Sequence, residues 1–151
     1  MTFRSWYASS APRSTLVVRL LVGAVFLSEG IQKFLYPEAL GVGRFAEIGI
    51  PAPTVLAPFV GSVEIACGTL LLLGLATRFA ALPLIAVITT AIATTKIPLL
   101  ASQGFWAMAD EARTDWSMLL GSLFLAIAGA APWSLDARWL ISRTKSTETT
   151  P

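Results

Sequence analysis

Residues 16–36 read LVVRLLVGAVFLSEGIQKFLY, a stretch that has the length of a membrane span and yet contains Arg19, Glu29 and Lys33. At 1.5 Å per residue, about 20 helical residues cross the roughly 30 Å hydrocarbon core of a bilayer. The stretch is therefore predicted to be a transmembrane helix. Ionisable groups at such depth are costly, so they are expected to pair with one another or to line a polar cavity.

Further apolar stretches of similar length follow at 55–76, 78–99 and 116–135. Each is a continuous apolar run rather than a ten-residue segment of alternating polarity, so helices are expected in place of barrel strands. The fold class predicted for residues 16–136 is all-α, an integral membrane four-helix bundle. The flanking segments 1–15 and 137–151 are predicted to be tails.

The composition agrees with a membrane protein and narrows the chemistry. Of the 151 residues, 55% are hydrophobic and 13% are charged, against about 25% charged in soluble domains. The chain has no histidine and one cysteine, Cys67, which excludes His-ligated metals, a disulfide within the chain and a Cys-ligated cluster. A net charge of +2 gives no basic footprint for nucleic acid. We therefore predict neither a metal site nor a nucleic-acid partner, and a lipid bilayer as the surroundings.

The distribution of lysine and arginine predicts the orientation. In a four-span topology, one side collects most of the positive charges, namely Arg4, Arg13, Arg78, Arg138, Arg143 and Lys145. The other side has Arg44 and Arg113, with Lys96 near the membrane edge. Both termini are therefore expected in the cytoplasm.

The loops on the opposite, outer side are too apolar to be free in water. Residues 37–53 contain Leu40 and Phe45, and residues 98–114 contain Phe105 and Trp106. Short helices that lie at the membrane interface or dip into the bundle are expected in both.

The intramembrane charges are predicted to gather at one level. Glu29 lies about 10 Å and Lys33 about 5 Å from the outer end of the first span, and Glu64 lies about 14 Å down the second. Lys96 is near the outer end of the third span and Asp115 begins the fourth. We predict that these five side chains line a polar, ligand-binding pocket that opens outward. The alternative is a structural network, in which Glu64 pairs with Lys33 and no ligand binds.

Small residues at helical spacing predict the helix contacts. The residues expected at the contact of the first two spans are Gly23, Gly30, Gly61 and Gly68. Ala86, Thr90 and Thr94 are expected at a contact made by the third span.

Two further side chains in the spans are not expected to take part in ligand binding in the pocket. Arg19 is near the cytoplasmic face, and its long stem is expected to let it reach lipid phosphate. Cys67 lies one turn from Glu64 and is expected to be a small packing residue rather than a reactive thiol.

Ordered motifs run along three of the spans and one loop. The first span reads RLLVGAVFxxxGxxK from Arg19 to Lys33, and FAEIGIP follows at 45–51. The second reads GxxEIxxGxLLLLGLxTR from Gly61 to Arg78, and the last runs from DWSMLLG to PWSLD at Asp136. Together these motifs resemble the DoxX family of small bacterial membrane proteins. The positions that match the family pattern are Arg19, Gly30, Lys33, Glu64, Gly68 and Arg78. The assignment of Glu29 to the pocket rests on its depth and spacing alone. The resemblance implies a four-helix protein of the bacterial cytoplasmic membrane.

The resemblance also implies a quinone-linked or redox-protective system, because related chains belong to quinol oxidases and thiosulfate:quinone oxidoreductases. This chain has no histidine, paired cysteine or nucleotide fingerprint, so electrons would pass through a bound quinone or a partner's cofactor. The leading hypothesis is a quinone- or small-amphiphile-binding membrane subunit that is not catalytic alone. Its partner would be a redox protein or a second copy of the chain. The alternatives are a scaffold that anchors a partner protein and a permeation path for a proton or small solute.

Overall fold

The computed structural model describes residues 12–130 and 133–136, and these are helical with no strand among them. The predicted tails fall largely outside the described residues. The helices, in chain order, are α2 (Thr15–Leu35), α3 (Pro37–Leu40), α4 (Val42–Glu47), α5 (Pro53–Leu73), α6 (Thr77–Ala91), the π-helix η1 (Ile92–Lys96), α7 (Ile97–Gln103), α8 (Phe105–Glu111) and α9 (Arg113–Ala128). The all-α class is confirmed, and both apolar loops contain the expected short helices.

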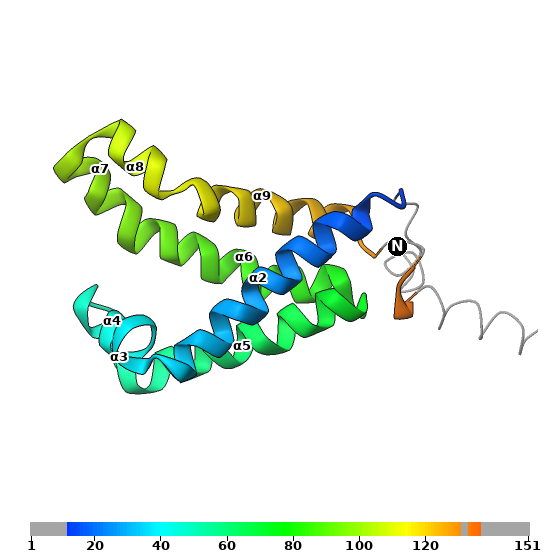
Figure 1. The fold of residues 1–151 in the computed structure, drawn as a ribbon, viewed down its shortest axis with the longest axis horizontal. Helices are drawn as coiled ribbons and strands as arrows, with labels where there is room; N and C mark the ends of the chain where they lie inside the picture. Colours follow the sequence, from blue (N-terminus) through cyan, green and yellow to red (C-terminus); the bar gives the residue numbers. More distant parts are fainter. Residues whose placement is uncertain (1–11, 131–132, 137–151) are drawn as a thin grey trace, which may run out of the picture.

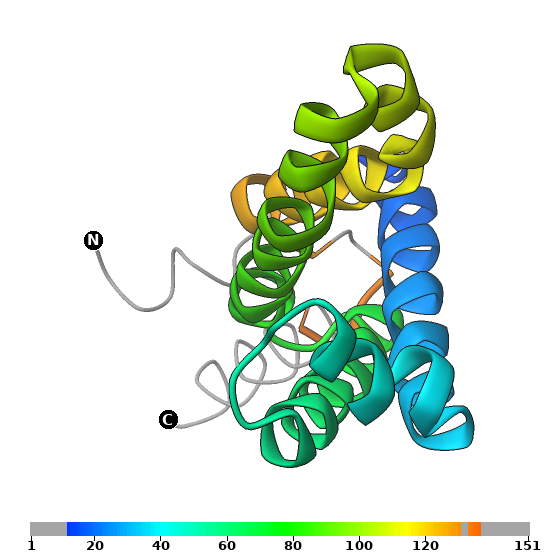
Figure 2. The same ribbon diagram turned by 90° about the vertical axis from the view of Figure 1, so that its left-hand side faces the viewer.

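The four long helices are arranged as two pairs, α2 with α5 and α6 with α9 (Figure 1). A short hairpin joins α5 to α6 at one end of the bundle, which we call the hairpin end. The short helices gather at the other end, the loop-helix end. Figure 2 looks along the bundle from this end, where α3 and α4 lie over α2 and α5, and α7 and α8 extend from α6 and α9. The two pairs diverge from the hairpin end toward the loop-helix end.

Three helical stretches in the described residues are long and apolar enough to cross a membrane: Thr15–Leu35, Pro53–Leu73 and Thr77–Gln103. The last is 27 residues long, because α6, η1 and α7 follow one another without a break. It therefore extends beyond the predicted boundary at residue 99.

The fourth long helix differs from the prediction of 116–135. It begins at Arg113 and ends at Ala128, because Gly129 adopts a φ of +77° that breaks the helical path. Its 16 residues span about 24 Å, less than the hydrocarbon core. Beyond the helix, the Asp136 backbone N–H donates to the Gly74 carbonyl at 3.2 Å.

The buried core joins all four long helices. Its members are Val22, Phe26, Cys67, Leu71, Ala80, Ala81, Leu84, Ile88, Met118 and Leu125. Cys67 is a free, buried thiol within this cluster. Many of the other large apolar side chains point outward, as expected for helices whose surroundings are lipid.

The backbones of α2 and α5 touch at paired glycines. A Cβ added to Gly30 would lie 2.7 Å from the Gly61 carbonyl oxygen, and one added to Gly68 would lie 2.9 Å from the Gly23 carbonyl oxygen. Because the obstructing atoms are backbone, the helices would have to move apart to admit a side chain. Small residues permit this close packing in membranes, where dispersion contacts rather than water exclusion hold helices together.

We expect Gly30→Ala to destabilise the protein by about 1–3 kcal/mol, the usual cost of overpacking a tight contact. Ala66→Leu is the matched control, because Ala66 is on the exposed side of α5. Thermal unfolding in detergent would measure both variants. An unchanged midpoint for Gly30→Ala would contradict the proposed importance of the contact.

Candidate functional site

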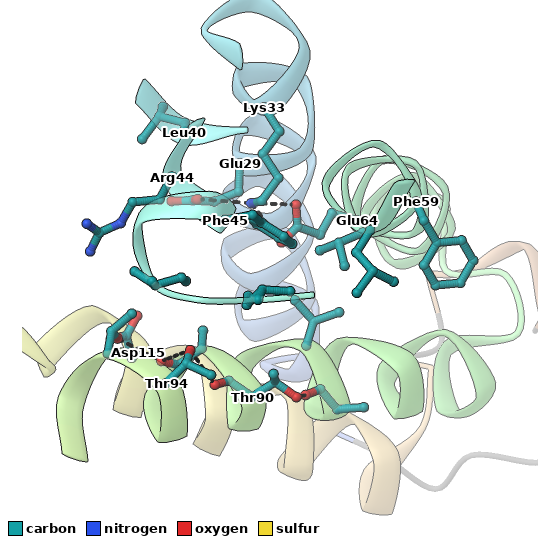
Figure 3. A pocket seen from close by; sticks show the side chains of 18 of the residues that line it. Glu29, Lys33, Leu40, Arg44, Phe45, Phe59, Glu64, Thr90, Thr94 and Asp115 are labelled. Atoms are coloured by element: carbon teal, nitrogen blue, oxygen red, sulfur yellow. Dashed lines mark hydrogen bonds and ion pairs between the residues drawn. The ribbon is translucent and has the colours of Figure 1, made fainter. Parts of the chain in front are cut away.

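A cavity of about 500 Å³ lies between the two helix pairs (Figure 3). We call it the central cavity. It is lined by Glu29, Lys33, Leu40, Arg44, Phe45, Ile48, Ile50, Leu56, Phe59, Val60, Glu64, Ala86, Val87, Thr90, Ala91, Thr94, Thr95, Lys96 and Asp115. All five ionisable residues that the sequence assigned to a pocket are on its wall.

One wall holds a buried lysine between two carboxylates. The Lys33 Nζ lies 2.8 Å from Glu64 Oε2 and 3.6 Å from Glu29 Oε2. The side chains of Lys33 and Glu64 are 12% and 4% exposed, whereas that of Glu29 is 53% exposed. Glu64 is therefore the enclosed partner of the lysine, and Glu29 is the carboxylate that faces the open part of the cavity.

The glycine contact explains why this pair forms. Gly30 is three residues before Lys33 on α2, and Gly61 is three residues before Glu64 on α5. Residues at this spacing share a helix face, so the two side chains emerge beside the touching backbones. A Cβ added to Gly61 would lie 3.5 Å from the Lys33 Cβ, which shows how closely the lysine crosses α5.

The other wall holds a second lysine between carboxylates. The Lys96 Nζ lies 3.2 Å from Asp115 Oδ2 and 3.3 Å from Glu111 Oε1. Lys96 is 12% exposed, Asp115 22% and Glu111 64%. Glu111 was not singled out from the sequence, because it lies in the apolar loop and its partner is 15 residues away.

Lys96 is the last residue of η1, whose wider turn was not foreseen from the sequence. Two threonine hydroxyls of this helix donate to carbonyls of the preceding turn, Thr94 to Thr90 at 2.9 Å and Thr95 to Ala91 at 2.7 Å. Such back-bonding side chains bend helices, and π-turns recur at functional sites.

The two lysine clusters face each other across the cavity. Figure 3 shows Lys33, Glu29 and Glu64 on one side, with Asp115 and Thr94 across from them. Leu40 and Phe45 of the short helices α3 and α4 complete the wall at the loop-helix end. The arrangement therefore offers two polar anchors within a mostly apolar lining.

The cavity also opens sideways, between α5 and α6. Phe59 lines it and is 61% exposed, and Ala86 and Thr90 of the facing wall are exposed as well. These residues belong to helices that are long and apolar enough to span a membrane. The prediction that Ala86, Thr90 and Thr94 form a helix contact is wrong, because α6 diverges from α5 and leaves these small side chains on a free wall.

Arg19 lies apart from the cavity, at the hairpin end. It is 3% exposed, and its Nη2 donates to the Trp133 carbonyl at 2.8 Å. The expected contact with lipid phosphate is therefore wrong, because the guanidinium is buried and bonded to the backbone of Trp133. Asp136 fixes that segment by accepting a hydrogen bond from the Ala76 N–H at 3.0 Å.

Residues 14–97 match the sequence profile of the DoxX family. The chain belongs to the DoxX family. It is 56% identical over 136 residues to the uncharacterized membrane protein Rv3486 of Mycobacterium tuberculosis, covering 86% of this chain and 83% of that protein. It is also 30% identical over 122 residues to a Bacillus subtilis protein named "Putative oxidoreductase CatD", covering 81% of this chain and 84% of that protein. No solved structure matches the chain.

The DoxX match covers part of the site. The matched residues extend from the start of α2 to the end of η1, and so include Lys33, Glu64 and Lys96 but not Asp115. Together with the apolar helices, the family establishes that this is a membrane protein. The chemistry of the cavity has to be argued from its geometry, since the name of the mycobacterial relative assigns no activity.

Removing only the lysine of the Lys33–Glu64 pair should destabilise the protein more than removing both charges. Lys33→Met leaves a buried carboxylate without its cation and should cost about 3–5 kcal/mol. The double variant Lys33→Met, Glu64→Gln should recover much of this loss, because no buried charge remains. Unfolding midpoints in detergent would be compared for the wild type, Lys33→Met and the double variant.

The exposed pair of Arg113 and Asp110, 75% and 71% exposed at 3.2 Å, provides the control. Arg113→Gln should cost at most about 1 kcal/mol. If Lys33→Met were no more destabilising than this control, the pair would not be the enclosed interaction described above.

Proposed function

We propose that this DoxX chain is a membrane subunit of a redox system and binds a quinone, or a small amphiphile of similar shape, in the central cavity. The observation that carries the proposal is the pair of facing lysine–carboxylate clusters in a cavity that opens toward lipid. Its volume of about 500 Å³ is within the usual range for small-molecule sites, and would take a quinone ring with the first part of its tail.

The sideways opening supports a ligand that arrives through the bilayer. A solute from water would meet the apolar side chains of Phe59, Val60 and Val87 on that wall. An isoprenoid or alkyl tail can instead remain between α5 and α6 while the ring reaches the polar anchors. Burial of the tail against these side chains would contribute binding energy in proportion to the apolar area removed from contact with water.

The two clusters suit a ligand with oxygens on opposite sides of a ring. Each lysine can donate to a carbonyl oxygen, and each carboxylate can accept a hydrogen bond from a hydroxyl group. The oxidised ligand would use Lys33 and Lys96, whereas the reduced ligand would also use Glu29 and Asp115. Hydrogen bonds that involve a charged partner are the stronger kind.

A role as a subunit follows from what the described residues can do. Lysines and carboxylates bind, orient and exchange protons, but they do not carry electrons. The one cysteine is buried in the core. Electrons would therefore pass between the bound quinone and a redox group on a partner protein. The name of the Bacillus subtilis relative, "Putative oxidoreductase CatD", supports this setting.

We further propose that the chain crosses the bacterial cytoplasmic membrane four times, with α9 as the fourth span and the loop-helix end outside. The positive charges of the hairpin and tails support this orientation. With Cys67→Ser as background, Ser146→Cys in the C-terminal tail should react with an impermeant maleimide only after the cells are opened. Labelling of intact cells at the same rate would overturn the orientation.

Quinone retention tests the ligand. Wild type, Glu64→Gln, Lys33→Met and Arg113→Gln would be purified in mild detergent, and quinone per protein measured in organic extracts. Wild type and Arg113→Gln should retain quinone. Lys33→Met loses a charge-assisted hydrogen bond to the ligand, about 1.5–3 kcal/mol, and should lower the quinone content roughly tenfold or more. Glu64→Gln removes the carboxylate that holds Lys33 in place and should also lower the quinone content.

Ala86→Trp separates binding from stability. It would fill the opening between α5 and α6 but leave both lysine clusters unchanged, so a long-tailed quinone should be lost while the fold is kept. Equal retention in wild type, Glu64→Gln, Lys33→Met and Ala86→Trp would rule out the central cavity as the binding site.

A further inference from the structure

A second cavity, of about 440 Å³, adjoins the first at the loop-helix end. Its lining is mostly polar, so we call it the polar pocket. It is lined by Arg44, Thr95, Lys96, Leu99, Gln103, Ala107, Asp110 and Glu111. These residues come from α4, η1, α7 and α8, the part of the molecule beyond the apolar middle of the bundle. A cavity of this kind is filled by water more readily than the central cavity.

The two cavities share a wall. Arg44, Thr95 and Lys96 line both of them. The Arg44 guanidinium is directed away from Lys33 and Glu64 in Figure 3 and pairs with Glu47 at 2.7 Å. Thr95 uses its hydroxyl on the Ala91 carbonyl. Lys96 is therefore the charged side chain of this wall whose ion pairs are with residues of other helices.

The partners of Lys96 lie on opposite sides of the wall. Glu111 lines the polar pocket and not the central cavity, whereas Asp115 lines the central cavity and not the polar pocket. The ammonium is within 3.3 Å of Glu111 and 3.2 Å of Asp115. These three side chains form a continuous polar connection between the polar pocket and the central cavity.

We propose that the polar pocket is the entrance through which water and protons reach the central cavity, with Lys96 as the barrier between the two. The charged groups that face this barrier are Arg44 from α4, Asp110 and Glu111 from α8, and Asp115 from α9. Movement of the lysine toward Glu111 opens the connection, and its return to Asp115 closes it.

The use of this entrance for proton exchange rests on the proposed quinone-binding function. When a bound hydroquinone is oxidised, its two O–H bonds break. Two electrons go to the acceptor on the partner protein, and two protons go to the carboxylates and then to water. Lipid on the side of Phe59 cannot take those protons. The ligand and its protons would therefore use different openings, the first between α5 and α6 and the second past Lys96.

Cysteine accessibility tests the entrance without any ligand. In a Cys67→Ser background, cysteines would replace Thr94 in the central cavity, Gln103 in the polar pocket and Ala86 at the lipid opening. The protein would be placed in nanodiscs, where both membrane faces are accessible. The reagent would be a small, permanently charged trimethylammonium methanethiosulfonate. We expect Gln103→Cys to react fast, Ala86→Cys to react slowly and Thr94→Cys to react at an intermediate rate.

Removal of the Lys96 side chain should have its largest effect in the central cavity. Adding Lys96→Ala should raise the rate at Thr94→Cys about tenfold, equivalent to about 1.4 kcal/mol, and leave Ala86→Cys unchanged. The rise at Gln103→Cys should be smaller, because that position loses a nearby positive charge but no barrier. Glu111→Gln, which leaves Lys96 paired with Asp115 in the closed position, should lower the Thr94→Cys rate. This second variant keeps the test decisive if Lys96→Ala fails to fold.

Two results would overturn the proposal. One is a Thr94→Cys rate as slow as that of Ala86→Cys in every background, and the other is a rate that neither Lys96→Ala nor Glu111→Gln changes. Quinone content measured on the same preparations separates the two proposals. Normal quinone with failed labelling rejects the entrance alone, whereas the expected labelling without quinone rejects the ligand alone.

Discussion

The contact between the backbones of α2 and α5 is the constraint on which the site depends. Glycines at facing positions leave no room for a Cβ between the helices, and this proximity brings Lys33 within 2.8 Å of Glu64. A single charge at this depth would be costly in an apolar medium, but a pair in contact satisfies both members. The same glycines that allow dispersion contacts between the helices thus also make it feasible to keep two ionised groups inside. Packing and site chemistry are consequently linked on these helices.

The second pair of helices has the opposite role, since it creates space. α6 leaves the hairpin beside α5 and then diverges, so its small residues Ala86, Thr90 and Thr94 line a cavity instead of a helix contact. The π-turn at η1 follows at the level where Lys96 meets Asp115. Two packed pairs that diverge from each other thus produce a chamber with one polar cluster on each wall. Its openings differ in character, because one is bordered by apolar side chains in mid-helix and the other by charged residues of the short helices.

Membership of the DoxX family gives this architecture a membrane setting, but the chain's own residues limit the chemistry that it can perform. Lysines and carboxylates can hold a ligand with two oxygens and exchange protons with it. Electron transfer requires a group that these side chains do not provide, which is why the proposed function is that of a subunit. The lipid-facing opening and the polar pocket then serve different reactants, since a hydrophobic tail and a proton cannot share one route at low cost. Burial of Arg19 under residues 133–136 has a separate, structural effect at the hairpin end.

The sequence by itself determined the helical membrane fold, the level of the intramembrane charges and the DoxX family, because hydrophobic length, spacing and ordered motifs are local properties of the chain. It also indicated that Lys33 and Glu64 would meet, since glycines at matching positions mark the faces that touch. Only the tertiary structure decided the end of α9 at Ala128, the partner of Arg19 and the fate of Ala86, Thr90 and Thr94. Each of these depends on where distant segments lie: small residues allow close approach but do not compel it, and a buried guanidinium binds whichever carbonyl the folded chain brings to it. The pairing of Lys96 with Glu111 is likewise a result of the loop helices folding beside η1, which no spacing along the sequence could specify.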